Sequence, residues 1–392
     1  MPFDYLALSL LGVVEWICLV PAICGSIFAV LCVLTMIWFH AKRPALKARF
    51  NDWPPVTVLK PVHGLEKNLR ENLRSTCIQE YPGFQVVFSV QELDDPAIPL
   101  LREMEKEFGP ERVAVAIENY RLGTNGKINN LMGGLLKAKY DILVISDSDV
   151  RLKPDYLKTI VAPLADPDIG CVCTLYKAAC AERWFERIEM LTLSADLIPS
   201  AVFAHITGAS KVCFGATTAL RRQTLDQVGG LQALADYLVE DFEMGQLIAG
   251  LGKKVWLIPY VVETVVDLKN ASQWWNHQVY WDQNNRAARP LVFFMTYIIR
   301  SVPFALLYAI LRMGDPLGLA VLAAVLGIRL LTAATILGWG LRDYEGLRNL
   351  ALLPLRDLVA LVSYVLAYAK RTTVWRGKEF VLTRDGRILA RK

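Results

Sequence analysis

A single uncharged stretch near the N-terminus constrains this chain more than any other feature. Residues 17–39 contain no charged side chain and are long enough to cross a hydrocarbon core, which needs about 20 helical residues. A signal peptide is the alternative, but such a segment begins with basic residues. Here Asp4 and Glu15 precede the stretch, and no Lys or Arg does. The sequence therefore predicts a transmembrane anchor over residues 1–40.

Basic residues follow this predicted anchor directly. Lys42, Arg43, Lys47 and Arg49 all lie within ten residues of its end. Because the flank richer in Lys and Arg stays on the cytoplasmic side of a membrane, we expect the N-terminus outside. The chain that follows residue 40 is then expected in the cytoplasm.

The composition predicts a soluble domain in addition to membrane segments. Of the 392 residues, 54% are hydrophobic and 21% are charged. This mixture is too apolar for an ordinary soluble enzyme and too charged for a transporter built of membrane helices. The net charge of +5 is mild and spread along the chain, which suits contact with an anionic bilayer and predicts no nucleic-acid partner.

Residues 51–288 have the pattern of an α/β domain. The clearest predicted strands are residues 56–60, 85–90, 112–117 and 141–147, and helical patterns separate them. Strands that are apolar on both faces predict a mostly parallel sheet covered by helices. Ligands of such sheets bind beyond the carboxyl ends of the strands, so candidate functional residues are sought there.

Apolar sequence returns near the C-terminus and predicts a membrane region over residues 291–370. The apolar runs and their interruptions are residues 291–311 with Arg300 and Pro303, residues 317–338 with Arg329, and residues 350–369 with Pro354, Arg356 and Asp357. Charges inside spans are costly, so these segments are expected to face one another, tilt or lie partly in the interface. The basic tail, residues 371–392, is expected in the cytoplasm, which requires an even number of crossings. One of the three runs is therefore expected to be interfacial or re-entrant.

The strongest chemical signal follows the fourth predicted strand. Residues 141–146 (DILVIS) run directly into Asp147 and Asp149. At the carboxyl end of a strand, two carboxylates separated by one residue can hold Mg²⁺ or Mn²⁺ and leave room for diphosphate oxygens. A turn that caps the following helix is the alternative interpretation.

Two weaker motifs follow the second and third predicted strands. Glu92, Asp94 and Asp95 follow the second strand, where a solvated acidic loop is an equally good interpretation. Residues 121–131 (RLGTNGKINNL) form a glycine-containing loop in which Lys127 opens a helix. A lysine at that position opposes the helix dipole, and a bound phosphate would account for it.

A fourth motif supplies candidate bases. Residues 239–243 (VEDFE) begin a predicted helix, and one of their carboxylates could accept a proton from an attacking hydroxyl. Acidic residues in a first helical turn are also ordinary partners of the helix dipole, which is the alternative.

An aromatic segment precedes the C-terminal apolar runs. In residues 273–289, His277 and Trp281 lie on one face of a predicted helix, and Arg286 and Arg289 could reach a diphosphate. An interfacial aromatic belt explains the same pattern. Arg286 could equally pair with the aspartate four residues before it.

The cysteines suggest no metal or disulfide framework by their spacing. None of the eight forms a CxxC pair, and three lie in the first apolar stretch. They are interpreted as reduced, buried, small hydrophobic residues.

The order of these motifs resembles that of a known enzyme family. The motifs are PPVTVLKPVHG, YPGFQVVFSVQELDDPA, GKINNL, SDSDV, ADYLVEDFEMG, the tryptophan-rich segment and a WRG sequence near the C-terminus. They resemble the ceramide glucosyltransferases and their bacterial relatives, including hopanoid glycosyltransferases. That family belongs to the inverting GT-A glycosyltransferases, whose fold is Rossmann-like. The resemblance covers roughly residues 8–385.

The resemblance implies roles for individual residues. The acidic motif near uridine falls on Glu92, Asp94 and Asp95, with Glu92 where relatives often have Asp. The metal-binding aspartates fall on Asp147 and Asp149, of which Asp147 also lies by the donor, and the catalytic base falls on Asp241.

The closing motif of the family falls on His277–Trp281. Tyr280 stands there where an arginine is usual. His277, Arg286 and Arg289 are then the candidate sources of positive charge for the diphosphate, together with Lys127.

The resemblance implies an inverting transfer of a sugar from a UDP-sugar to the primary hydroxyl of a membrane lipid. Glucose is the favoured sugar, and ceramide is the favoured lipid. Mg²⁺ or Mn²⁺ would be the cofactor, and the chain would be a multi-pass protein of a bacterial inner membrane with its catalytic domain in the cytoplasm. Residues 184–205 are amphipathic enough to lie at the membrane surface and deliver the lipid, with an ordinary core helix as the alternative. A hopanoid, other lipid or polysaccharide glycosyltransferase using UDP-GlcNAc or a related donor remains open, as does a non-catalytic nucleotide-sugar sensor.

Overall fold

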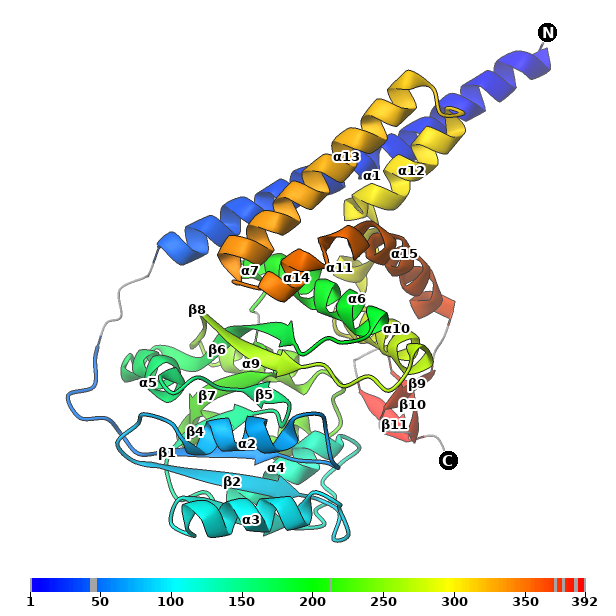
Figure 1. Cartoon of the computed structure of the whole chain (residues 1–392). Coiled ribbons are helices and arrows are strands. Elements are labelled where there is room, and N and C mark those ends of the chain that lie inside the picture. Colours follow the sequence, from blue (N-terminus) through cyan, green and yellow to red (C-terminus); the bar gives the residue numbers. More distant parts are fainter. Residues whose placement is uncertain are drawn as a thin grey trace. The chain divides into compact units, whose positions relative to one another are not determined.

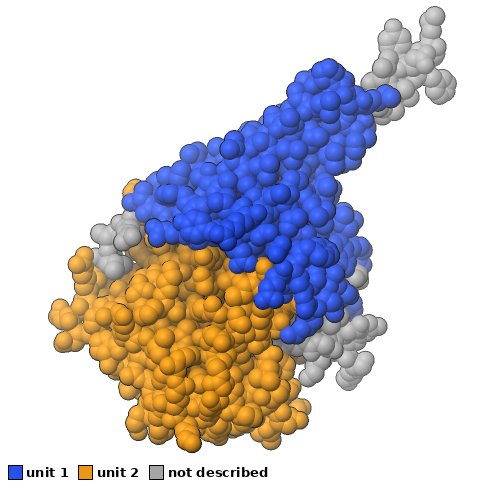
Figure 2. Space-filling view, in the orientation of Figure 1, with its two compact units in different colours: residues 1–41, 182–203, 269–373 blue, residues 42–181, 204–268, 374–392 orange. Residues whose placement is uncertain are grey.

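The computed structural model describes residues 2–42, 48–211, 213–369, 372–375, 378–383 and 387–390. The chain divides into two compact units, which Figure 2 shows in different colours. Unit 1 comprises residues 1–41, 182–203 and 269–373, and unit 2 comprises residues 42–181, 204–268 and 374–392. Arg43 and Lys47 of the predicted basic flank, and Arg376 and Gly377 of the WRG sequence, lie outside the described residues.

Unit 2 is built on one mixed sheet of eight strands in the order β3-β2-β1-β4-β7-β6-β8-β5 (Figure 1). The strands are β1 (Val56–Pro61), β2 (Phe84–Val90), β3 (Val113–Ile117), β4 (Ile142–Ser146), β5 (Val150–Arg151), β6 (Ile169–Ala179), β7 (Thr217–Arg221) and β8 (Lys254–Val265). The first four confirm the predicted strands to within one residue at each end. They pair in parallel, as do β6 and β8, whereas β7 and β5 run antiparallel to their neighbours.

Helices cover this sheet in the order that the strand–helix alternation predicts. They are α2 (Leu69–Cys77), α3 (Ile98–Phe108), α4 (Gly126–Leu136), α5 (Tyr156–Val161), α8 (Arg222–Gln227) and α9 (Glu240–Gly250). Every residue of β1 and β2 is buried, which explains why neither strand alternates regularly between apolar and polar residues. Helix α4 packs on β1 and β2, and α9 packs on β6 and β8. A second, three-stranded sheet has the order β11-β10-β9, from β9 (Thr372–Trp375), β10 (Lys378–Leu382) and β11 (Ile388–Ala390).

The antiparallel strand β7 determines what lies at the carboxyl end of β4. Ser146, the last residue of β4, is paired with Thr217, the first residue of β7. The segment that precedes β7 therefore lies beside the turn that follows β4. This pairing brings residues some seventy positions apart in sequence to the same edge of the sheet.

Unit 1 is helical. Its elements are α1 (Pro2–Ala41), α6 (Trp184–Thr192), η2 (Leu193–Leu197), α10 (Ala271–Ala288), α11 (Pro290–Met295), η4 (Thr296–Ile299), α12 (Ser301–Leu311), α13 (Pro316–Thr335), η5 (Ile336–Gly340), α14 (Tyr344–Arg348), η6 (Leu350–Leu352) and α15 (Leu353–Ala369). Helix α7 (Ile198–Thr207) continues η2 across the division between the units.

Four helical segments of the described chain are long and apolar enough to cross a membrane. They are Gly12–Ala41, Trp184–Thr207, Pro316–Gly340 and Leu350–Ala369. A fifth candidate is the pair Pro290–Ile299 and Ser301–Leu311, which is bent by 47° at Arg300 and is either a broken span or a re-entrant loop. The first segment and the C-terminal ones agree with the predicted apolar runs. Trp184–Thr207 was expected to lie at the membrane surface or in a core, and its length and composition also suit a span.

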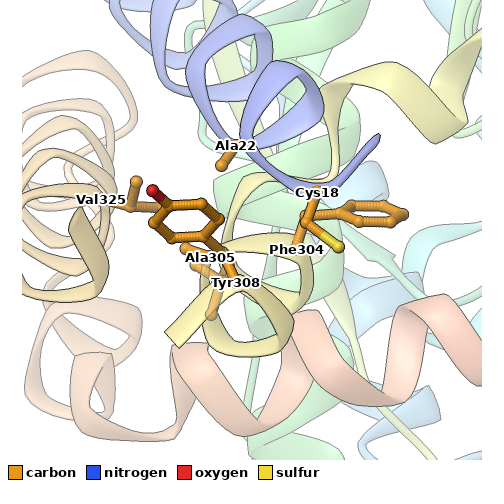
Figure 3. Close-up of a cluster of buried hydrophobic side chains, with 7 residues drawn as sticks. Cys18, Ala22, Phe304, Ala305, Tyr308 and Val325 are labelled. Carbon is orange, nitrogen blue, oxygen red and sulfur yellow. The ribbon is translucent and has the colours of Figure 1, made fainter. Parts of the chain in front are cut away.

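Small side chains let the helices of unit 1 pack closely. Cys18 and Ala22 of α1 meet Ala305 and Tyr308 of α12 in a buried apolar cluster that also includes Val325 of α13 (Figure 3). Close approach through small residues is the usual way in which helices associate where no hydrophobic effect drives them together.

The charges that interrupt the apolar runs pair with one another inside unit 1. Arg329 of α13 donates to both carboxylate oxygens of Asp357 in α15, at 2.8 and 3.0 Å. Arg356 donates to Asp196 of the π-helical turn η2 at 2.6 Å and to Asp357 at 3.2 Å. Because an unpaired charge inside an apolar span is costly, this pairing explains how the helices tolerate these residues. Of the expected alternatives, the facing arrangement is confirmed for residues 317–338 and 350–369, which Arg329 and Asp357 join.

Gly25 provides a test of how unit 1 is packed. A Cβ atom at Gly25 would lie 2.5 Å from the carbonyl oxygen of Ile299, at the bend before α12. Gly25→Ala is expected to destabilise unit 1 by about 1–3 kcal/mol, because a backbone atom cannot move aside as a flexible side chain can. Gly12→Ala in the same helix is the matched control, since nothing lies within 4 Å of its added Cβ. Thermal unfolding of the detergent-solubilised chain, followed by circular dichroism, should show a lower Tm for Gly25→Ala only, and equal Tm values would contradict this packing.

Candidate active site

Asp147 and Asp149 lie on a tightly held turn between β4 and β5. The turn is closed by a hydrogen bond from the Val150 N–H to the Asp147 carbonyl, at 3.2 Å. The ammonium of Lys60, which is fully buried in β1, donates to Ser146 Oγ at 3.3 Å and to the Val150 carbonyl at 3.0 Å. These two acceptors flank the Asp-x-Asp sequence on either side. Lys60 therefore holds the turn that carries both carboxylates.

Lys127 connects this turn to α9. Its Nζ lies 2.7 Å from Asp147 Oδ1 and 3.0 Å from Glu240 Oε1, and it donates to the Gly215 carbonyl at 3.3 Å. Burial alone would lower the pKa of Lys127, but the carboxylates of Asp147 and Glu240 overcome this and raise it. The charge of Lys127 at the start of α4 opposes the helix dipole, and the two carboxylates stabilise it there.

Asn125 and Glu240 hold the lysine in place. The Asn125 side chain caps α4 by accepting from the N–H groups of Lys127 and Ile128, at 2.9 and 3.2 Å. Its Nδ2 donates to Glu240 Oε2 at 3.3 Å and to the Tyr237 carbonyl at 2.8 Å. Glu240 was not a predicted site residue. The sequence shows two adjacent carboxylates at the start of a predicted helix. It does not show which of the two faces Lys127.

Asp241 sits on the same first turn of α9, in a setting that suits a base. The N–H of Phe242 donates to Asp241 Oδ1 at 2.7 Å, and the backbone of Gly215 lies against the carboxylate. Burial, followed by the nearby charge of Glu240, raises the pKa of Asp241 to about 7, against the opposing effect of Lys127. A carboxylate with that pKa can take up and release a proton near neutral pH.

Gly215 allows Asp241 to approach the end of β4. A Cβ atom at residue 215 would lie 2.8 Å from Asp241 Oδ2. Lys127, Gly215, Glu240 and Asp241 together line one small pocket, with apolar residues of α4, α9 and the sheet behind them. Sequence reasoning missed Gly215, because only the antiparallel pairing of β7 brings it here.

The Asp-x-Asp turn suits a hard divalent cation. Among the described residues, the buried Oδ1 atom of Asp149 has no hydrogen-bond partner. Burial, followed by the charges of Asp147 and Glu66, raises the pKa of Asp149 to about 8 against the opposing charges of two lysines. Glu66, which sequence reasoning missed, accepts from Ser148 Oγ at 2.6 Å. A cation with oxygen ligands, such as Mg²⁺ or Mn²⁺, would offset this crowding of negative charge.

The acidic motif after β2 divides into one structural and two exposed carboxylates. Asp95 is buried, and it accepts from the N–H groups of Gly64, at 2.9 Å, and Ala97, at 2.8 Å. These bonds give Asp95 a role in holding the loops after β1 and β2. Glu92 and Asp94 are exposed, and their side chains are available to a ligand.

The closing motif belongs to unit 1. His277 Nδ1 lies 2.8 Å from a carboxylate oxygen of Glu189 in α6, and Trp281 Nε1 donates to His277 Nε2 at 2.8 Å. Both ring nitrogens are therefore used, and Nδ1 carries the proton of the neutral ring. The Arg286 guanidinium lies 5.5 Å from the centre of the Tyr368 ring. Glu189 was not predicted, because nothing in the sequence relates α6 to α10.

Comparison with known proteins gives a consistent picture. Residues 14–388 match the model of glycosyl transferase family 21. Ceramide glucosyltransferase 3 of Caenorhabditis elegans is 23% identical over 368 residues, which are 87% of this chain and 76% of that protein. Ceramide glucosyltransferase 1 of the same organism is 28% identical over 206 residues, which are 51% of this chain and 43% of that protein. This chain thus spans less than half the length of the second relative.

A solved structure shares the fold. A mannosyltransferase from Pyrobaculum calidifontis, in complex with GDP-Man and Mn²⁺, superposes with a TM-score of 0.53 at 20% identity. The match covers 90% of this chain and 99% of the other. At this identity the likeness concerns the fold, and it confirms the GT-A architecture expected for the α/β domain.

Proposed function

Since the chain belongs to glycosyl transferase family 21, we propose that it transfers glucose from UDP-glucose to the primary hydroxyl of ceramide, with inversion at the anomeric carbon. The observation that carries the proposal is the group formed by Lys127, Asp147, Glu240 and Asp241 at the carboxyl end of β4. A base with a pKa near 7 beside the proposed diphosphate site is what a single displacement requires.

In this mechanism Asp241 accepts the proton of the lipid hydroxyl while the oxygen attacks the anomeric carbon. The bond from that carbon to the diphosphate breaks on the opposite face, so an α-linked donor gives a β-glycoside. Asp147 and Asp149 would hold Mg²⁺ or Mn²⁺, which supplies charge neutralisation for the leaving diphosphate. Lys127, held between Asp147 and Glu240, adds positive charge on the same side.

The donor would extend toward the loop after β2. Glu92 and Asp94 are proposed to contact it, because both are exposed at the carboxyl edge of the sheet. Trp281 and Arg286 are proposed as further donor contacts. His277 would orient Trp281, since its own ring nitrogens are already bonded to Glu189 and Trp281.

The acceptor is proposed to reach the site from the bilayer. The apolar helices mark the chain as a membrane protein, and the relatives named above act on ceramide by their names. We propose further that residues 51–288 work on the cytoplasmic side, because basic residues follow residue 40 and residue 369.

The proposal is tested by supplying purified full-length protein with labelled UDP-glucose or UDP-GlcNAc, each with ceramide or a hopanoid. Labelled lipid is expected in the UDP-glucose and ceramide reaction. Transfer to the hopanoid from UDP-GlcNAc, with none to ceramide, would replace the proposed substrates. Hydrolysis of the donor without any lipid product would overturn the proposed reaction.

A further inference from the structure

Three cysteines that are far apart in sequence converge in the core of unit 2. Cys171 and Cys173 are two residues apart on β6, so both side chains point to the same face of the sheet. Cys213 comes from the segment that leads into β7. The three sulfur atoms all lie within 4.8 Å of one another, and the Sγ atoms of Cys173 and Cys213 are 3.4 Å apart. All three side chains are buried.

We propose that Cys171, Cys173 and Cys213 form a binding site for a thiophilic metal ion, separate from the carboxylate site for Mg²⁺ or Mn²⁺. Thiolates select soft ions such as Cu(I) and Zn(II) over the hard ions that carboxylates prefer. At a metal–sulfur distance of about 2.3 Å, three sulfurs in a plane around one ion lie about 4.0 Å apart. The observed cluster needs only small side-chain movements to reach that spacing.

A neighbouring hydroxyl group supports metal binding by the three cysteines. The hydroxyl oxygen of Thr218 lies 3.5 Å from the sulfur of Cys173 and 3.7 Å from that of Cys213, so a fourth, oxygen ligand is at hand for Zn(II).

The cluster is joined to the candidate catalytic segment. Gly245 of α9 packs directly on Cys213, since a Cβ atom at Gly245 would lie 2.8 Å from the Cys213 Cβ. Two residues beyond Cys213, Gly215 packs against Asp241, since a Cβ atom there would lie 2.8 Å from Asp241 Oδ2. An ion held by Cys213 would therefore fix the backbone against which Asp241 is placed.

The test uses purified full-length protein under anaerobic, reducing conditions, so that Cys173 and Cys213 stay as thiols. Cd²⁺, as a probe for Zn(II), and Cu(I) are titrated in separate arms, and sulfur-to-metal charge transfer is followed by ultraviolet absorption. We expect saturation at one equivalent of at least one of the two ions. Excess Mg²⁺ should not displace the ion, because hard ions compete poorly for thiolates.

Single replacements decide whether the cluster is the site. Cys171→Ala, Cys173→Ala and Cys213→Ala should each remove the saturable signal, whereas Cys77→Ala, a buried cysteine outside the cluster, should keep it. Circular dichroism of each variant shows whether it is folded, and the serine variant of the same cysteine replaces any alanine variant that is not. Absence of saturable binding of either ion, survival of the signal in the folded cluster variants, or displacement by Mg²⁺ would overturn the proposal.

Discussion

Asp241→Asn is expected to lower kcat by about 10²- to 10⁴-fold while binding of UDP-glucose stays close to that of the unchanged protein. A positioned base contributes roughly that factor, because a lipid hydroxyl has a pKa far above neutrality. The asparagine keeps the shape of the side chain and removes its basicity. Product formation gives kcat, and isothermal titration calorimetry gives the donor affinity.

Two neighbouring carboxylates serve as comparisons. Glu243→Gln changes a residue of the same helical turn that is absent from the pocket lining, and it should leave kcat nearly unchanged. Glu240→Gln removes an ion-pair partner of Lys127 and is expected to have an intermediate effect. If Asp241→Asn kept most of its turnover while Glu240→Gln lost it, Asp241 would not be the base and Glu240 would take its place.

The pH profile gives an independent check on Asp241. A base works in its deprotonated form, so kcat should rise with pH and level off above the pKa of about 7. In Glu240→Gln the loss of the neighbouring negative charge should move this rise to lower pH. A profile that is flat between pH 5 and pH 9, or one that falls over this range, would contradict the assignment.

The second large effect is expected at the Asp-x-Asp turn. Asp149→Asn should reduce Mn²⁺ binding in the presence of UDP and lower turnover at least about 10²-fold, because charge neutralisation by a metal contributes several kcal/mol to such reactions. Electron paramagnetic resonance of free Mn²⁺ measures the binding directly. Asp155→Asn is the matched control, since Asp155 is outside this turn and accepts a hydrogen bond from Tyr260.

Chelation should reproduce this loss in the unchanged protein. Removal of divalent ions with excess chelator is expected to abolish turnover, and Mg²⁺ or Mn²⁺ should restore it. Full activity in metal-free buffer, or Mn²⁺ binding by Asp149→Asn equal to that of the control, would remove the proposed metal role.

Local sequence patterns were enough to predict the frame of the α/β domain. The four parallel strands and the helices between them are continuous in sequence, and their burial on both faces leaves an apolar signature. The position of Asp147 and Asp149 followed from the same pattern, because they come directly after a buried strand. Local order of this kind is read reliably from periodicity.

Contacts between distant segments could not be predicted in this way. Lys127 was expected to need a phosphate, and the structure gives it Asp147 and Glu240 as partners. The approach of Gly215 to Asp241 depends on the pairing of β7 with β4, and the convergence of the three cysteines depends on the pairing of β6 with β7. No spacing rule relates such residues, since each contact arises only when the sheet is assembled.

The configuration of the lipid product tests the central proposal most directly. Purified protein would be supplied with UDP-glucose, ceramide and Mg²⁺ or Mn²⁺, and the isolated product treated with an α- or a β-specific glucosidase. Attack by a hydroxyl that Asp241 deprotonates predicts a product that only the β-specific enzyme cleaves, and no product from Asp241→Asn in the same time. A product cleaved only by the α-specific enzyme would contradict the single displacement on which the whole assignment of this site rests.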